Sequence, residues 1–272
     1  MRQIHLDATL AAKILEIARE SAIAIMHIYE EMLIKGGDVK DVLVAHKNDS
    51  SPLTLADLQA HQIISKGLAA LAPGVPVVSE EDSQSMDCRS PIGDFWLIDP
   101  LDGTKEFLAQ DGEFTVNIAL IRDGKAILGV IVAPALAQAY WGGDGLGAFR
   151  EMDRRRETIH VAKRVGLGQP VRVLASKNHM NAETIEFISR LGTYELLQAG
   201  SSLKFCRLAE GAADVYPRLG PTCEWDTAAA QAIVEAAGGC VSKLDGTPLS
   251  YGKQDILNPH FVASSTPLHD LS

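Results

Sequence analysis

The pattern of apolar segments changes part-way along the chain, and this change limits the folds that the sequence can adopt. Apolar segments at residues 114–121 and 126–133 are joined by Arg122-Asp123-Gly124-Lys125. An Asp-Gly pair between two such segments predicts an antiparallel β-hairpin. From residue 171 onward, short apolar segments instead alternate with helical patterns, which is typical of α/β proteins. We therefore expect an α+β half with an antiparallel sheet at residues 1–160 and an α/β half at residues 161–272.

Apolar spacing and turn residues predict the individual elements. Leu10, Ile14 and Ile17 begin a helical repeat that predicts an amphipathic helix over residues 7–35, and Thr54 precedes a second helix that runs to residue 71. The other expected strands span residues 75–78, 95–98, 171–175, 194–197, 214–216, 240–242 and 261–263, and the other expected helices 182–191, 201–210 and 226–237. No change of composition marks the join between the halves, so we expect them to act as one unit.

The charge balance argues against some classes of partner. The formal net charge is −10, and an acidic protein has no general electrostatic attraction for a nucleic acid polymer. The basic run Arg154-Arg155-Arg156 is flanked by Asp153 and Glu157, which favours a solvated loop or turn. An anionic ligand would need local cations, such as bound metal ions, to overcome the negative field.

Cysteine spacing and hydropathy predict a cytoplasmic protein. Cys88, Cys206, Cys223 and Cys240 form no C-x-x-C pair, which favours reduced thiols over a disulfide framework or a zinc site. The first residues carry charges and lead directly into the first helix, so no signal peptide is expected. The longest uncharged stretch, residues 126–143, is short and contains Gly and Pro, so no transmembrane segment is expected. Peripheral attachment to the inner face of the membrane and a homodimer both remain open.

The stretch Asp99-Pro100-Leu101-Asp102-Gly103-Thr104 follows a short apolar segment and indicates a ligand site. Pro100 disfavours a helix at Asp99, so the chain is expected to turn sharply as it leaves the sheet. Asp99 and Asp102 would then converge, with the Leu101 carbonyl between them. Hard divalent cations such as Mg²⁺ prefer oxygen ligands of this kind. A turn stabilised by Asx-type hydrogen bonds is the alternative interpretation.

Three further acidic positions are better explained by structural roles when each is taken alone. Ser79-Glu80-Glu81-Asp82 follows the segment at 75–78, where three acids often form only a solvated loop. Asp226, after Trp225, is a candidate N-cap of an alanine-rich helix. Asp57 matches a capping box that begins at Thr54. Taken together, acids at several strand ends are what a phosphoryl-transfer site with more than one metal ion requires.

The order and spacing of these stretches identify a resemblance. Ser79-Glu80-Glu81-Asp82, Asp99 to Thr104 and Trp225-Asp226 resemble the inositol monophosphatase superfamily of lithium-sensitive, Mg²⁺-dependent phosphatases. Within it, the chain is similar to the CysQ-type 3′(2′),5′-bisphosphate nucleotidases, on the basis of four stretches. These are residues 102–107 (Asp-Gly-Thr-Lys-Glu-Phe), 112–117, 200–206 and 216–222. Inositol monophosphatases more often have Thr-Asn where this chain has Lys105-Glu106. The resemblance implies a layered αβαβα sandwich of the sugar-phosphatase type.

The resemblance also implies roles for individual residues. Glu80, Asp99 and the Leu101 carbonyl would hold one Mg²⁺, and Asp99, Asp102 and Asp226 a second. A third, weaker ion would lie near Asp57 and Glu80, and Li⁺ would inhibit. Asp57 and Thr104, with Glu80, would form the catalytic set that positions the attacking water. The substrate would contact Glu80, Leu101, Asp102, Gly103, Thr104, Ser201, Lys204, Arg218 and Asp226.

The substrate is expected to be a small phosphorylated metabolite. Ser201 and Lys204, at an expected helix start, and Arg218 are candidates for a second phosphate, because helix N-termini and cations attract anions. A serine cap with a surface lysine is the competing interpretation. No contact role follows from the sequence for Lys105 or Glu224. The favoured function is hydrolysis of 3′-phosphoadenosine 5′-phosphate to AMP and phosphate. An inositol or sugar monophosphate phosphatase and a non-enzymatic metal-binding protein are the alternatives.

Overall fold

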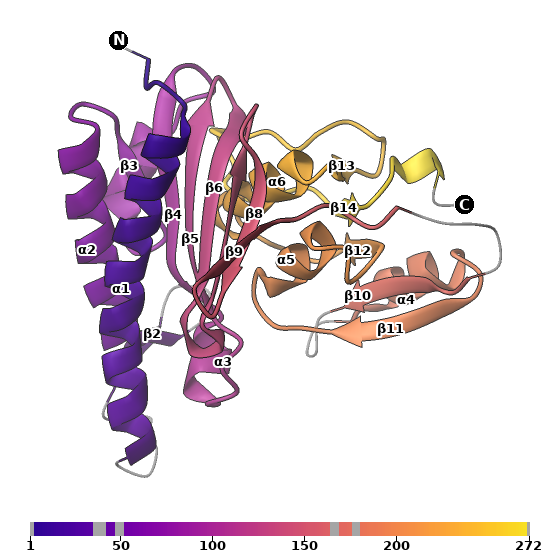
Figure 1. Cartoon of the computed structure of the whole chain (residues 1–272), viewed down its shortest axis with the longest axis horizontal. Helices are drawn as coiled ribbons and strands as arrows, with labels where there is room; N and C mark the ends of the chain where they lie inside the picture. Colours follow the sequence, from indigo (N-terminus) through magenta and orange to yellow (C-terminus); the bar gives the residue numbers. More distant parts are fainter. Residues whose placement is uncertain (1–2, 35–41, 47–51, 164–168, 176–179, 271–272) are drawn as a thin grey trace.

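The computed structural model describes residues 3–34, 42–46, 52–163, 169–175 and 180–270 of the 272-residue chain. Helices α1 (Ala8–Ile34) and α2 (Leu55–Leu71) cover one face of a seven-stranded sheet. Helices α5 (Leu203–Ala209) and α6 (Ala228–Ala236) lie between this sheet and a five-stranded sheet (Figure 1). Helix α4 (Ala182–Ser189) packs on the outer face of the smaller sheet. The expected αβαβα layering is confirmed.

The larger sheet comes from the first half of the chain. Its strands, in spatial order, are β3 (Val77–Ser79), β4 (Asp94–Asp102), β5 (Thr115–Arg122), β6 (Lys125–Ala133), β7 (Gln138–Gly143), β8 (Gly147–Met152) and β9 (Arg155–Thr158). All neighbours are antiparallel except β3 and β4. The predicted hairpin is present, with Arg122 opposite Lys125 and positive φ at both Asp123 and Gly124. A separate antiparallel pair joins β1 (Leu43–His46) to β2 (Pro52–Thr54).

The smaller sheet comes from the second half and is mixed. Its order is β11 (Tyr194–Gln198), β10 (Val171–Ala175), β12 (Val215–Arg218), β14 (Phe261–Ser264) and β13 (Cys240–Lys243). The β11-β10-β12 part is parallel, as expected of an α/β half. Strand β14 is antiparallel to both of its neighbours. The chain reaches β14 from β13 without an intervening helix, and a parallel connection would need such a crossover.

Two helices begin later than the sequence predicts. Helix α5 begins at Leu203 instead of residue 201, since Ser201 has a left-handed φ of 48° that no helix can include. Helix α6 begins at Ala228, and residues 224–226 form a separate 3₁₀ turn, η4 (Glu224–Asp226). Asp226 is therefore not the N-cap of α6. The first helix has the predicted extent up to Ile34, and its expected last residue, Lys35, lies outside the described residues.

Close packing fixes the position of α6 on the larger sheet. A Cβ atom on Gly129 of β6 would lie 1.9 Å from the Ala229 carbonyl oxygen, and one on Gly142 of β7 would lie 3.1 Å from Ala236 Cβ. Glycine in the strands and alanine in the helix are thus required for this approach. The 3₁₀ turn with Asp226 immediately precedes α6, so the same packing places Asp226 relative to β4 and β5.

The basic run is only partly a loop. Arg154 lies in a turn, whereas Arg155 and Arg156 belong to the exposed edge strand β9. The Arg156 guanidinium lies 3.9 Å from the centre of the Phe149 ring, which is a cation–π contact. Among the described residues, no helix combines the length and the apolar character that crossing a membrane requires.

Candidate active site

The Asp99 to Thr104 stretch leaves the large sheet through a bulge. Strand β4 continues to Asp102, with Asp99 opposite Asn117 and Asp102 opposite Thr115, so the sharp turn expected at Pro100 is replaced by a local irregularity of the strand. Such bulges re-aim side chains beside functional sites. Asp99 is 1% exposed and accepts a 3.1 Å hydrogen bond from the Leu101 amide.

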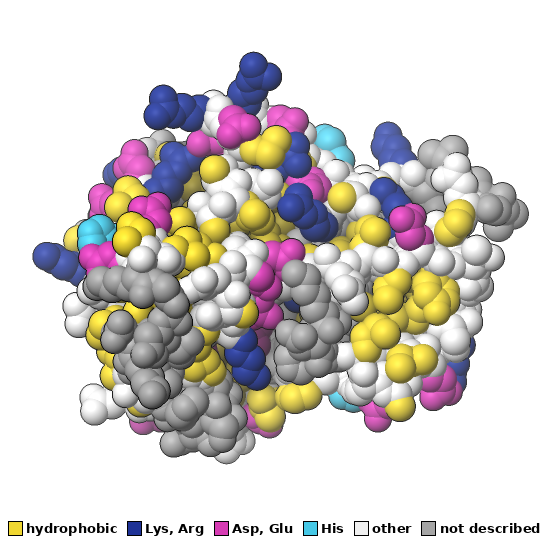
Figure 2. All heavy atoms as spheres, turned by 90° about the horizontal axis from the view of Figure 1, so that it is seen from below, with side chains coloured by type: hydrophobic (Ala, Val, Ile, Leu, Met, Phe, Trp, Pro, Cys, Tyr) yellow, Lys and Arg dark blue, Asp and Glu magenta, His cyan; other side chains and the backbone are white. Residues whose placement is uncertain are grey.

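Most of the predicted site residues line one pocket of about 270 Å³. They are Glu80, Asp99, Leu101, Asp102, Gly103, Thr104, Ser201, Lys204, Arg218 and Asp226, and Lys105, for which no contact role was expected, lines the pocket as well. Figure 2 shows the end of the molecule that carries α3 (Thr104–Leu108), where acidic side chains gather near the middle of the face with Lys and Arg side chains around them. The structure thus brings together the acid that follows β3, two acids of β4 and one of η4, which are far apart in the sequence. Asp57 and Glu224 do not line this pocket.

Asp57 is connected to the pocket through Thr104. Its Oδ2 accepts hydrogen bonds from the amide and the hydroxyl of Thr54, which completes the predicted capping box of α2. Its Oδ1 lies 3.3 Å from Thr104 Oγ1, and that hydroxyl is also 3.2 Å from the Leu101 carbonyl oxygen. The capping and the functional interpretations of Asp57 are therefore compatible, because each uses a different carboxylate oxygen.

Residues from the second half of the chain hold Asp102. Its Oδ2 accepts hydrogen bonds from Ser201 Oγ at 2.6 Å and from the Ser202 amide at 2.7 Å. Ser202 Oγ donates to Asn117 Oδ1 at 2.8 Å, and Thr115 Oγ1 lies 2.7 Å from both serine hydroxyls. These contacts join the loop before α5 to strands β4 and β5. Ser201 thus contacts a predicted metal ligand directly.

The carboxyl of Asp226 is buried beside other acids of the pocket. Burial, followed by the charges of Asp102 and Glu80, raises the pKa of its carboxyl well above the usual value. One oxygen accepts a 2.8 Å hydrogen bond from the Cys223 amide. A cation placed among these acids would relieve their repulsion and favour the ionised form of the carboxyl. The donor set therefore fits a divalent metal ion.

The acids do not form a metal cage by themselves. Within the described part of the chain, no three side chains of His, Cys, Asp or Glu are close enough together to hold a metal ion unaided. Mg²⁺ is usually held by one or two carboxylates together with waters and substrate phosphates, instead of an all-protein cage. The open carboxylate arrangement and the Leu101 carbonyl agree with that mode of binding.

The two cations predicted to bind a second phosphate differ in their surroundings. Lys204 Nζ donates to the carbonyl oxygens of Ser201 at 2.6 Å and Ala199 at 3.3 Å. Burial lowers the pKa of Lys204 to about 8. Arg218 donates one hydrogen bond to the Pro221 carbonyl, and its buried Nε has no hydrogen-bond partner. Arg218 therefore retains more capacity for a ligand than Lys204 does.

A sequence model of the inositol monophosphatase family matches residues 8–270. The chain belongs to the inositol monophosphatase family. It is 44% identical over 253 residues to the 3′(2′),5′-bisphosphate nucleotidases CysQ of Shigella flexneri and of Escherichia coli (strain K12), which covers 93% of this chain and 98% of each relative. The predicted resemblance to this family and to its CysQ-type members is confirmed.

Solved structures agree with this membership. The crystal structure of CysQ from Bacteroides thetaiotaomicron, described as a bacterial member of the family, superposes with a TM-score of 0.81 at 36% identity. The match covers 94% of this chain and 97% of that one. Inositol monophosphatase from Anabaena, at 24% identity and a TM-score of 0.71, shows the shared fold.

This family member has pocket residues that the sequence analysis did not select. Glu106 lines the pocket, and burial raises the pKa of its carboxyl. Phe205, Tyr216 and Phe261 form a packed aromatic floor, with ring centres 5.1 to 6.2 Å apart. Glu106 belongs to the stretch at residues 102–107 that carries the family resemblance, and this position could have marked it as a pocket residue. Phe205 and Tyr216 lie in the quoted stretches 200–206 and 216–222. Those stretches do not predict their contact with Phe261, because the three rings meet only when β12, β14 and α5 pack together.

Proposed function

We propose that this protein is a Mg²⁺-dependent phosphatase that hydrolyses 3′(2′),5′-bisphosphate nucleotides, with 3′-phosphoadenosine 5′-phosphate giving AMP and phosphate. The single observation that carries this proposal is the 44% identity, over 98% of their length, to relatives named as 3′(2′),5′-bisphosphate nucleotidases. The pocket supports it, because carboxylates and the two cations Lys204 and Arg218 line the same cavity.

The proposed metal ligands line the pocket, except for Asp57, which is connected to it through Thr104. Glu80, Asp99 and the Leu101 carbonyl would hold one ion, and Asp99, Asp102 and Asp226 a second, with a weaker third near Asp57 and Glu80. When bound, such ions lower the pKa of a coordinated water and neutralise charge on the transferred phosphoryl group. The raised pKa of Asp226 supports this assignment, since the charges of Asp102 and Glu80 contribute to it after burial.

The chain's own groups would orient the reaction. Thr104 Oγ1, held between Asp57 Oδ1 and the Leu101 carbonyl, would position the attacking water and pass its proton toward Asp57. The backbone of residues 101–104 would hold the phosphate that is cleaved, through the amides after Leu101, because the Leu101 amide donates to Asp99. Phosphoryl transfer depends mainly on such positioning and on charge stabilisation. The water oxygen bonds to phosphorus, and the leaving nucleoside oxygen takes up a proton.

We also propose that residues 1–272 act as a single catalytic unit. The half at 1–160 would supply most metal ligands, and the half at 161–272 would supply substrate contacts and Asp226. The hydrogen bonds from Ser201 and Ser202 to Asp102 support this division, because neither half completes the site alone. A cytoplasmic location is supported by the four cysteines, none of which forms a disulfide bond. Membrane attachment and a homodimer remain predictions from the sequence.

A side-by-side assay tests the substrate. Phosphate release is measured for 3′-phosphoadenosine 5′-phosphate and for inositol 1-phosphate, each with Mg²⁺ and with excess EDTA. We expect the nucleotide to have the higher kcat/KM and EDTA to abolish turnover. Preference for inositol 1-phosphate would instead favour the monophosphatase alternative, which the engagement of Lys204 with backbone carbonyls supports. Absence of turnover on both would favour the non-enzymatic alternative.

A further inference from the structure

Glu224 is a fully buried carboxylate two residues before Asp226, and it lies outside the pocket. Its Oε2 accepts a 2.9 Å hydrogen bond from the Gly252 amide, and its Oε1 accepts one from the Lys253 amide at 3.0 Å. Lys253 Nζ forms an ion pair with Oε1 at 2.5 Å. A buried carboxylate is costly unless such partners compensate its charge. The turn that carries Asp226 is therefore bound to the loop at residues 250–254.

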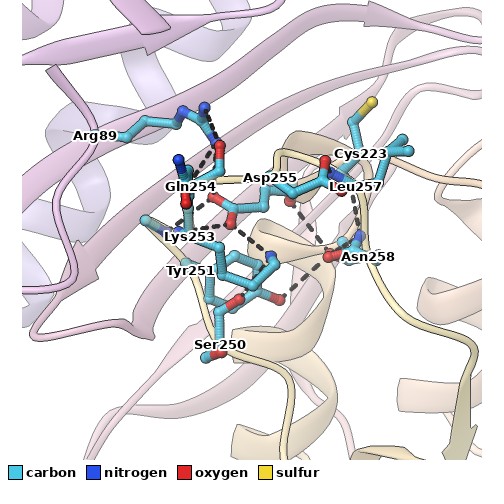
Figure 3. Close-up of polar contacts among 12 residues, drawn as sticks. Arg89, Cys223, Ser250, Tyr251, Lys253, Gln254, Asp255, Leu257 and Asn258 are labelled. Carbon is cyan, nitrogen blue, oxygen red and sulfur yellow. Dashed lines mark hydrogen bonds and ion pairs between the residues drawn. The ribbon is translucent and has the colours of Figure 1, made fainter. Parts of the chain in front are cut away.

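Arg89 also binds the loop at residues 250–254. Its guanidinium donates to the carbonyl oxygens of Lys253 at 3.1 Å and of Gln254, and it lies 4.0 Å from Glu224 Oε2. Figure 3 shows Arg89 pointing toward Gln254, with Lys253 and Tyr251 beside it. The loop also packs tightly against the segment that carries Arg89, because a Cβ atom on Gly252 would lie 2.4 Å from the Ser90 carbonyl oxygen.

Arg89 is connected in turn to the segment of Glu80. It directly follows the 3₁₀ helix η2 (Ser83–Cys88), which is capped by Asp82. The Ser79 amide donates to Ser85 Oγ within that helix, and the Glu80 amide donates to the Ile98 carbonyl of β4. A continuous series of contacts therefore connects the segment of Glu80, through Arg89 and Glu224, to the turn that carries Asp226. Two proposed metal-ligand segments from different halves of the chain share one anchor.

We propose that Arg89, Glu224 and Lys253 form an ionic clamp that positions Asp226 relative to Glu80 for metal binding. The clamp rests on the proposed metal site, and its members are positioning residues that touch neither substrate nor metal. Groups that orient metal ligands typically change metal affinity or activity by about 10–100-fold when they are removed. We expect loss of the clamp to act mainly on metal affinity.

Two substitutions with opposite charge changes separate positioning from a long-range electrostatic effect. Glu224→Gln removes a negative charge, and Lys253→Met removes a positive one. If only the field at the metal site mattered, Glu224→Gln would weaken cation binding and Lys253→Met would strengthen it. If the clamp positions Asp226, both substitutions weaken cation binding. Lys125→Met is the matched control, since Lys125 is exposed and lines the same surface hollow as Lys253 without contacting Glu224.

The measurement is the affinity for Mn²⁺, followed by the electron paramagnetic resonance signal of the free ion and checked by Mg²⁺ competition. We expect Glu224→Gln and Lys253→Met each to weaken binding by about tenfold or more, with Lys125→Met unchanged. The double variant should be weaker than wild type by less than the product of the two single effects, because both remove one interaction. In both variants, the Mg²⁺ concentration that gives half the maximal rate should rise by a larger factor than the factor by which kcat at saturating Mg²⁺ falls.

Specific outcomes overturn the proposal. Unchanged or tighter Mn²⁺ binding by folded Lys253→Met would overturn it. Thermal unfolding verifies that the variants are folded. If either variant is unfolded, Arg89→Lys replaces it, since lysine cannot reproduce the forked contacts of Arg89, and normal Mn²⁺ affinity in that variant would overturn the clamp. Wild-type protein that binds no Mn²⁺ would overturn the metal site and the clamp together, whereas Mn²⁺ binding without nucleotide hydrolysis would overturn the proposed substrate alone.

Discussion

The hydroxyl of Thr104 lies 3.3 Å from Asp57 Oδ1, although the two residues are 47 positions apart in the sequence. The other oxygen of Asp57 caps α2 through Thr54. One carboxylate therefore has two separable tasks, which are to stabilise the start of a helix and to face the pocket through a hydroxyl.

This relationship predicts different effects for two changes at Thr104. Thr104→Val removes the hydroxyl with little change of shape, and we expect kcat to fall by about 100-fold or more, since proton transfer by positioned groups contributes about 10²–10⁴-fold. Thr104→Ser keeps the hydroxyl and should keep most of the rate. Phosphate release under saturating Mg²⁺ measures both. A fully active Thr104→Val variant would remove this residue from the mechanism.

Asp99→Asn is expected to abolish turnover while the fold survives. Asn retains an oxygen that can accept the hydrogen bond from the Leu101 amide, but it removes one charge from the proposed metal ligands. Loss of a carboxylate also relieves repulsion among clustered acids, so the free energy of unfolding should stay equal or rise. Urea unfolding and phosphate release are measured on the same preparation. Normal turnover by the folded variant would contradict the role of Asp99.

Li⁺ is expected to inhibit by competing for a Mg²⁺ position, as the family resemblance implies. Initial rates are measured against LiCl and against NaCl at matched ionic strength, which controls for screening of charges. Raising the Mg²⁺ concentration should change the LiCl curve and leave the NaCl curve alone. Superimposable LiCl and NaCl curves would count against the proposed arrangement of ions.

Arg218 is expected to determine the preference for a second phosphate. Its buried Nε has no hydrogen-bond partner, and a charge-assisted hydrogen bond contributes about 1.5–3 kcal/mol. Arg218→Ala should therefore lower kcat/KM for 3′-phosphoadenosine 5′-phosphate about 10- to 100-fold more than for a monophosphate. Arg218→Lys tests whether charge alone suffices. Equal losses on both substrates would show that Arg218 serves only the structure of its loop.

Lys204 predicts a specific pH dependence of stability. Burial lowers its pKa from 10.5 to about 8, so between these values the unfolded chain holds a proton that the folded protein has released. Stability contributed by this group therefore rises with pH across that window. Urea unfolding gives the free energy of unfolding of wild type and of Lys204→Met at pH 7.5 and at pH 9.5. The stability of wild type relative to Lys204→Met should be greater at pH 9.5 than at pH 7.5. A constant difference would contradict the lowered pKa.

Short-range hydrogen bonds made several features predictable from the sequence. The hairpin at Asp123-Gly124 and the capping box from Thr54 to Asp57 each involve residues no more than four positions apart. The acids that follow strands β3 and β4 could likewise be assigned to a common site, because these strands are neighbours in the sheet. Such local preferences act before distant parts of the chain meet, so their sequence patterns are reliable.

Tertiary packing decided the rest. The place of helix α6 on β6 depends on the close approach to Gly129. The hydrogen bond from Ser201 to Asp102 joins residues that are 99 positions apart in the sequence. The pKa of Lys204 is lowered because surrounding residues bury its side chain, which its neighbours in the sequence do not predict. The sequence by itself therefore determined which acids and turns the chain carries, and only the packed layers decided which of them meet, because contacts between distant residues form only where whole elements fit together.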